Sequence, residues 1–153
     1  MIGSQAVMEI AATLSNHTSL TALALRETAM QDITPGYRRP ERMPTQLRTL
    51  DLADNNLGGL IEGTDHRNPN RMQITQYLQG CTNLQTLHLD DNGLGDRVTT
   101  HLLDHHLRTM PLTTLDLGSN SLSPNIVPAL CQALSEMRAM RKLLLQHNFL
   151  GPA

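Results

Sequence analysis

The chain has 153 residues, a length that fits one domain able to bury about two-thirds of its unfolded surface. The formal net charge is −2, so no overall positive field favours nucleic acid or an anionic membrane surface. The mild apolar stretch at the N-terminus has no Lys or Arg before it and is interrupted by Glu9, which argues against a signal peptide and against a membrane span.

The first elements that the sequence predicts are a helix and a strand. The apolar residues in the range 4–16 recur at helical spacing and predict a helix there, and Ser4 can cap its N-terminus. A short strand follows, in which Leu23 and Leu25 stand two positions apart and therefore point to the same face. The connection 31–46 contains three prolines, so we expect an extended or turn-rich loop rather than a helix.

The spacing around this first strand recurs along the chain. From Leu84 to Leu94 it reads L-x-x-L-x-L-x-x-N-x-L. A weaker copy starts at Leu20, where Thr28 replaces the asparagine and Met30 replaces the last leucine. The remaining copies begin at Leu47, Leu112 and Met140. The sequence therefore contains five repeats, starting near residues 20, 47, 84, 112 and 140.

Helices are expected between the strand units. Successive repeats begin 27, 37, 28 and 28 residues apart, and the long second interval indicates an irregular insertion at residues 62–71. Apolar spacing then predicts helices over 72–80, 96–110 and 125–137. Pro128 is tolerated in the last of these because it falls in the first turn.

The repeated spacing has a physical reason. Leucines two positions apart form one apolar face of a short strand, and no single repeat can bury that face alone. Stacking neighbouring strands in parallel buries the leucines and leaves the intervening residues on an exposed sheet. An asparagine amide can both donate and accept hydrogen bonds, so a column of asparagines can satisfy the backbone of adjoining turns. We therefore interpret Asn55, Asn92, Asn120 and Asn148 as part of the scaffold rather than of a site.

A strand unit, an asparagine turn and a full helix at intervals of 28 residues resemble the ribonuclease-inhibitor-like class of leucine-rich repeats. That class includes ribonuclease inhibitor, the Ran GTPase-activating protein and the repeat domains of NOD-like receptors. The resemblance implies an α/β solenoid, a right-handed β/α horseshoe arc with about five short parallel strands inside and about four helices outside. The resemblance covers nearly the whole chain, and we expect residues 1–153 to form a single domain that is either complete or part of a longer repeat protein. The resemblance also implies a role in protein binding.

The residues between the strand leucines are expected to line the concave face of this arc. The face includes Ala53 and Gly118 and, with its bordering turns, carries six of the 14 acidic residues. These acids suggest a groove for a basic segment of a partner, whereas the alternative is a merely soluble strand surface. Aromatic and arginine anchors, which tight interfaces favour, are almost missing from it. The candidate protein-binding residues are Arg26, Glu27, Asp51, Asp54, His88, Asp90, Asp91 and Asp116.

Basic residues gather in the two irregular connections, 31–46 and 62–71, which stacking would place side by side. Arginine can bind phosphate or carboxylate through two hydrogen bonds, and a tyrosine can stack on a base. Acidic residues in the same segments dilute the charge, so we favour a solvated loop over a nucleic acid site. The candidate insertion-loop patch is Tyr37, Arg38, Arg39, Arg42, His66, Arg67 and Arg71.

No catalytic, cofactor or metal site is expected. His101 and His105 stand four apart on a predicted helix and could share a metal ion, but they lack the glutamate of an H-E-x-x-H motif. We therefore interpret them as exposed helix histidines. Asp90 to Gly93 begins like a calcium loop, but Leu94 and His101 occupy ligand positions. Recognisable nucleophile, phosphate-binding and dinucleotide-binding motifs are also missing.

The cysteines indicate a reducing compartment. Cys81 and Cys131 are fifty positions apart and form no C-x-x-C motif. We expect both to be small buried thiols in a cytoplasmic protein.

The function that we infer from the sequence is a non-catalytic protein–protein interaction module. One alternative is a GTPase-regulatory or other enzyme-associated repeat protein, and another is a structural subunit of a larger assembly. The last strand, near Leu143 to Leu145, is strongly apolar, and no helix is predicted to follow it. We therefore expect this edge to be covered by further repeats or by self-association.

Overall fold

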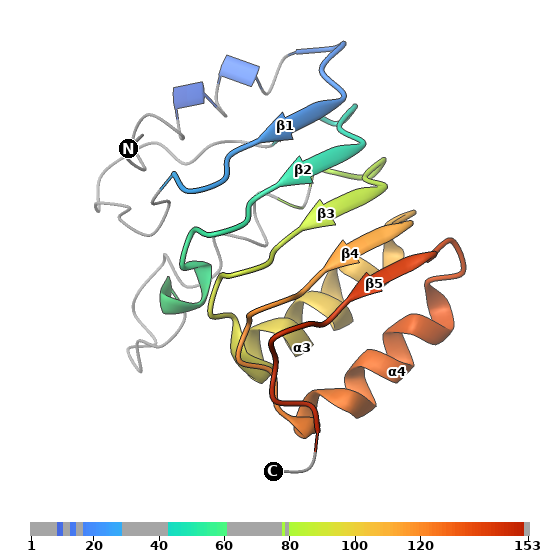
Figure 1. Cartoon of the computed structure of the whole chain (residues 1–153). Coiled ribbons are helices and arrows are strands. Elements are labelled where there is room, and N and C mark those ends of the chain that lie inside the picture. The colour runs from blue at the N-terminus through green and yellow to red at the C-terminus, as the bar shows by residue number, and fades with distance from the viewer. Residues whose placement is uncertain are drawn as a thin grey trace, which may run out of the picture.

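The computed structural model describes residues 9–10, 13–14, 17–28, 43–60, 78 and 80–151. Within these residues the chain forms a parallel sheet of five strands, arranged side by side in sequence order (Figure 1). The strands are β1 (Ala22–Ala24), β2 (Thr49–Asp51), β3 (Thr86–His88), β4 (Thr114–Asp116) and β5 (Lys142–Leu144). The prediction of five short parallel strands, one in each repeat, is confirmed.

One leucine from each strand forms a continuous row through the sheet. Leu50 of β2 pairs with Leu87 of β3, which in turn pairs with Leu115 of β4, and all three are fully buried. Leu23 and Leu143 continue the row into β1 and β5, where each is only partly buried. The register is the same at every step because each repeat presents the same leucine spacing.

The described α-helices are α3 (Gly95–His105) and α4 (Val127–Glu136), which pack against each other on one side of the sheet (Figure 1). Short 3-10 helices accompany them, namely η1 (Leu57–Leu60), η2 (Leu107–Thr109) and η3 (Pro124–Ile126). The predicted helices over 96–110 and 125–137 are therefore each divided into a 3-10 turn and an α-helix. Only these two of the four expected helices are seen. The other two, over 4–16 and 72–80, fall largely outside the described residues.

The core lies between the sheet and the helices. The leucine two positions after the strand leucine is fully buried there in the three middle repeats, as Leu52, Leu89 and Leu117, whereas the equivalent Leu145 of the last repeat is partly buried. Leu102 and Leu103 of α3 are also fully buried against this layer. Burying a leucine side chain stabilises a fold by about 1.5–3 kcal/mol, so the repeated leucines supply most of the driving force for stacking.

The asparagine column joins each repeat to the one before it. Asn92 is 1% exposed, and its Oδ1 accepts hydrogen bonds from the backbone N–H groups of Asn55 (3.0 Å) and Leu57 (3.3 Å). Its Nδ2 donates to the carbonyls of Leu52 and Leu89, both at 3.0 Å. Bonds of the same kind are made by Asn55, Asn120 and Asn148. The interpretation of these asparagines as scaffold is confirmed.

The turn that carries each member of this column has a residue with left-handed backbone. The residue before the Asn or Thr of the column has a positive φ in all five repeats, with values from 52° to 57°. A side chain at such a position is usually Asn, Asp or Gly, because other residues meet steric strain there. These residues are Glu27, Asp54, Asp91, Ser119 and His147. The turn therefore fixes the backbone at the acidic border that the sequence predicted.

Candidate functional site

The face of the sheet opposite α3 and α4 is the candidate interaction surface (Figure 1). On this face the register aligns Asp51, His88 and Asp116 in neighbouring strands. Ala24 and Leu144 extend the same row to the first and last strands. The structure thus brings together the residues that the sequence placed between the strand leucines.

Arg26 and two of the acids form an ion-pair network on this face. The Nε of Arg26 lies 3.3 Å from Oδ2 of Asp51, and Nη2 lies 3.4 Å from Oδ2 of Asp90. The arginine side chain is 45% exposed and each aspartate is 21% exposed. Ala53 occupies the position equivalent to Arg26 in the repeat between them, and its small side chain leaves room for the arginine to reach Asp90. Asp51 and Asp90 are therefore already partly neutralised within the chain.

Asp116 is only 7% exposed, so it is not the exposed groove residue that the alternation predicted. Its Oδ1 accepts hydrogen bonds from the backbone N–H of Gly118 (2.9 Å) and from Nε2 of Gln146 (3.3 Å). Gly118 and Ala53, which were also expected on the exposed face, are buried as well. The alternation of inward and outward residues therefore fails at these three positions, whereas in the third repeat it continues from Leu87 to Asp90.

Three acids at the border of the face remain exposed. Glu27, Asp54 and Asp91 occupy the left-handed turn position in three consecutive repeats. Neighbouring strands lie about 4.8 Å apart, so these carboxylates form a column along the rim. The acids of this face therefore divide into an exposed rim and a more buried group, in which Asp51 and Asp90 contact Arg26.

Two family models of leucine-rich repeats match the chain. One matches residues 80–97, and the other matches residues 46–65 and 111–133. These segments contain β2, β3 and β4 with the turns that follow them. The chain contains leucine-rich repeats. Comparison with curated proteins found no match. Among the described residues of these repeats, no helix is long and apolar enough to cross a membrane.

Three histidines of the third leucine-rich repeat form a cluster at the end of α3. The rings of His101 and His105 have centroids 4.5 Å apart, and His106 lies 6.1 Å from His101. Burial, followed by the charges of the neighbouring imidazoles, lowers the pKa of His101 and of His106. His105 is exposed as predicted, whereas His101 and His106 are half-buried. The lowered pKa values favour neutral rings at this end of α3.

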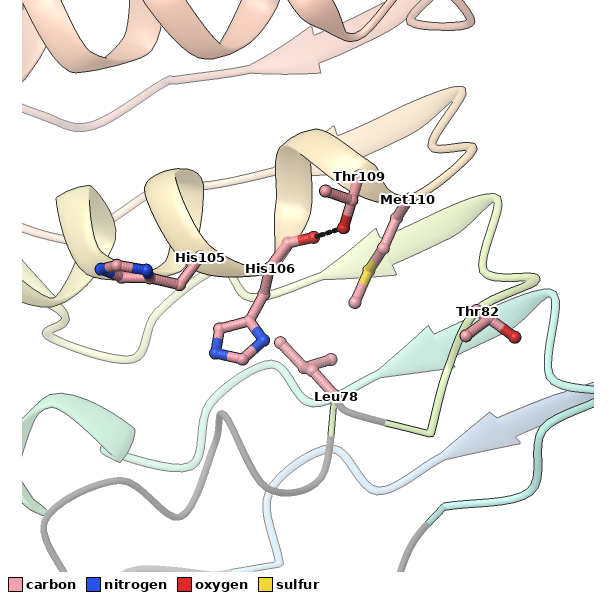
Figure 2. A pocket seen from close by; sticks show the side chains of 6 residues that line it. All are labelled: Leu78, Thr82, His105, His106, Thr109 and Met110. Carbon is pink, nitrogen blue, oxygen red and sulfur yellow. Dashed lines mark hydrogen bonds between the residues drawn. The ribbon is translucent and has the colours of Figure 1, made fainter.

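His105 and His106 also border a surface hollow of about 330 Å³ (Figure 2). Figure 2 shows the imidazole of His106 directed toward Leu78, with the thioether of Met110 beside them. Thr82 and Thr109 complete the described lining, and Thr109 Oγ1 donates to the carbonyl of His106 at 2.9 Å. The hollow lies on the helical side of the repeats, away from the sheet face that carries Arg26 and the acids.

The two cysteines differ from the expectation that both are buried. Cys81 is buried, but Cys131 of α4 is exposed. Burial raises the pKa of Cys81 to about 12, which keeps that thiol protonated at neutral pH. Neither cysteine is in a disulfide.

The predicted insertion-loop patch lies outside the described residues. Its members are Tyr37, Arg38, Arg39, Arg42, His66, Arg67 and Arg71.

Sequence reasoning missed the pairing of Arg26 with Asp51 and Asp90, although a signal for it was present. Arg26, Ala53 and Asp90 occupy equivalent positions in the first three repeats. A long cation, a small residue and an acid at one repeat position predict an ion pair that spans the middle repeat. Likewise His88 and Asp116 are 28 residues apart, which is one repeat interval.

Proposed function

We propose that this protein is a non-catalytic binding scaffold of the ribonuclease-inhibitor-like class, in which the open sheet face and its acidic rim hold a protein partner. The observation that carries the proposal is the constant register of five parallel strands, with α3 and α4 on the opposite side. Such a surface can lay a partner segment across successive repeats, because each strand presents the same position at a fixed spacing. The 28-residue interval and a full helix after β3 and after β4 support the class.

The chemistry of the rim supports a partner with basic groups. Glu27, Asp54 and Asp91 are exposed. The chain has no Trp and only one Phe, so large aromatic anchors contribute little to its surfaces. Electrostatic complementarity would then supply much of the specificity and of the association rate. Binding of this kind weakens as the salt concentration rises.

A scaffold role also agrees with the chemistry of the described side chains. The thiol of Cys81 is buried, and its raised pKa makes it a poor nucleophile. The carboxylates of Asp51 and Asp90 are held by Arg26 on the sheet face. We therefore propose binding without catalysis, in the reducing environment of the cytoplasm.

The experiment compares partner binding by two variants with the same change in net charge, one altered on the sheet side and one on the helical side. The rim variant carries Glu27→Gln, Asp54→Asn and Asp91→Asn. The control variant carries Asn125→Lys, Gln132→Lys and Glu136→Gln, which are exposed positions on and beside α4. Each set raises the net charge by three, so a difference in binding between them reports the location of the charge.

Affinity capture from the native cell should be performed with the parent and both variants, followed by titration of each purified partner at two salt concentrations. We expect a partner that the parent and the control variant retain, that the rim variant loses, and that high salt releases. Equal retention of every partner by the rim variant and the parent would rule out the acidic rim as the binding surface.

A further inference from the structure

The sheet face contains a group of three side chains with the chemistry of metal ligands. One nitrogen of His88 and one carboxylate oxygen each of Asp90 and Asp116 lie within 4.8 Å of one another. His88 and Asp116 come from adjacent strands at paired positions, and Asp90 lies two residues after His88, just past the end of β3. The strand register fixes His88 and Asp116, and the backbone at Asp90 is held by the N–H of Asp54, which donates to its carbonyl at 2.9 Å. We propose that His88, Asp90 and Asp116 bind one divalent transition-metal ion such as Zn²⁺.

The electrostatics of the face favour a bound cation. Three carboxylates, those of Asp51, Asp90 and Asp116, lie close together, and the single guanidinium of Arg26 contacts two of them. Of the three carboxylates only that of Asp116 is not in contact with Arg26, and the four side chains together carry a net charge of −2. Asp116 is nine-tenths buried at its side chain, where an uncompensated charge is costly. A divalent ion would balance the remaining two charges.

A second observation concerns the carboxylate of Asp90. Oδ1 of Asp90 is buried and has no hydrogen-bond partner, although Oδ2 of the same carboxylate accepts from Arg26 at 3.4 Å. Buried carboxylate oxygens are nearly always paired, so an unpaired one indicates a ligand or an ordered water. Nδ1 of His88 lies 3.8 Å from Oδ2 of Asp116, too far for a hydrogen bond between them. The three side chains therefore lie close together without hydrogen bonds between them.

The ligand types select the ion. Imidazole suits zinc and other transition metals, whereas magnesium and calcium prefer sites made only of oxygen. Zinc bonds of about 2.0–2.2 Å in a tetrahedral site place the ligand atoms about 3.4 Å apart, so the side chains must close by at most about 1.4 Å. Three protein ligands leave the fourth tetrahedral position open on the sheet face. That position is accessible to water or to a group of a bound partner.

Calorimetric titration of the full chain with Zn²⁺, under a reductant that does not bind zinc, tests the proposal. We expect one ion per chain and at least tenfold weaker binding in His88→Gln and in Asp90→Asn, because each removes one ligand. Asp116 is not used as a test position, since it also holds the backbone of Gly118. Cobalt added in place of zinc should give the visible absorption of a tetrahedral site in the parent and lose it in His88→Gln.

Two controls report binding elsewhere. Asp91→Asn removes an exposed acid beside Asp90 with the same change in charge, and His101→Gln/His105→Gln removes the imidazole pair of α3. Both should bind zinc as the parent does. Absence of saturable binding by the parent, or parental affinity in either ligand variant, would overturn the proposal. Loss of the ion in the α3 variant would also overturn it, because the ion would then lie on the helix.

Discussion

Replacing Asn92 by alanine tests how far the asparagine column holds the repeats together. Asn92 lies in the middle of the column and is 1% exposed. The substitution removes an acceptor for the N–H groups of Asn55 and Leu57 and a donor to the carbonyls of Leu52 and Leu89. The side chain is small, so the cavity that alanine leaves adds less than the lost hydrogen bonds.

The size of the expected loss in stability depends on which backbone groups lose their only hydrogen-bond partner. The carbonyl of Leu52 still accepts from Nδ2 of Asn55 at 2.9 Å, and that of Leu89 still accepts from Nδ2 of Asn120 at 2.9 Å. The loss therefore falls mainly on two buried N–H groups, each of which costs about 1–3 kcal/mol when unpaired. We expect Asn92→Ala to lower the free energy of unfolding by about 2–6 kcal/mol.

Urea denaturation followed by circular dichroism measures this loss, and Asn148→Ala provides the matched control. Asn148 accepts from the N–H groups of Asn120 and Leu122 in the same way, but it is only partly buried at the edge of the array. Water can replace part of its role, so its loss should be clearly smaller. A loss below about 1 kcal/mol for Asn92→Ala, or equal losses in the two variants, would refute the reasoning.

Three further predictions concern packing and pH. Leu89→Ala should lower the free energy of unfolding by about 2–5 kcal/mol in the same assay, since Leu89 is fully buried. Gly58→Ala should lower the melting temperature, because a Cβ there would overlap the carbonyl of Gly93 in the next repeat; an unchanged melting temperature would contradict this. Burial, and then neighbouring imidazoles, lowers the pKa of His101 and of His106, so the unfolded chain takes up protons more readily than the folded one. Stability should therefore fall as the pH drops below the usual histidine value of about 6.5, and His101→Gln/His106→Gln should reduce that slope in thermal melts at pH 7.5 and pH 5.5.

The sheet and its register could be predicted because each repeat has the same leucine spacing. Leu50, Leu87 and Leu115 are in equivalent positions, and only parallel stacking in one register buries all of them. The asparagine column was predictable for a related reason, since an amide at a buried turn needs partners in the neighbouring repeat. Thr28 fits the same column despite its different side chain, as its N–H donates to Oδ1 of Asn55 at 2.9 Å.

The ends of the helices and the burial of the site were less predictable. Apolar spacing indicated one helix over 96–110, but the backbone changes to a 3-10 turn at Leu107, immediately after three crowded histidines. The burial of Asp116 depends on Gln146 of the next repeat, which folds over it and donates to its Oδ1. Contacts of this kind depend on which side chain happens to stand in the neighbouring repeat, and a pattern read along one repeat does not contain that information.

Equivalent positions in neighbouring repeats predict side-chain contacts that the pattern within one repeat does not. The chemistry of the sheet face lies in contacts between repeats, such as His88 with Asp116 one interval apart and Arg26 with Asp90 two repeats apart. The leucines and asparagines must be the same in every repeat because stacking demands it, whereas the positions between them are not constrained in this way. A position at which neighbouring repeats carry side chains of opposite charge or of metal-binding type is therefore where a function of this surface should be sought. In this chain those positions converge on β2, β3 and β4, where the proposed metal ligands and the ion-pair network meet.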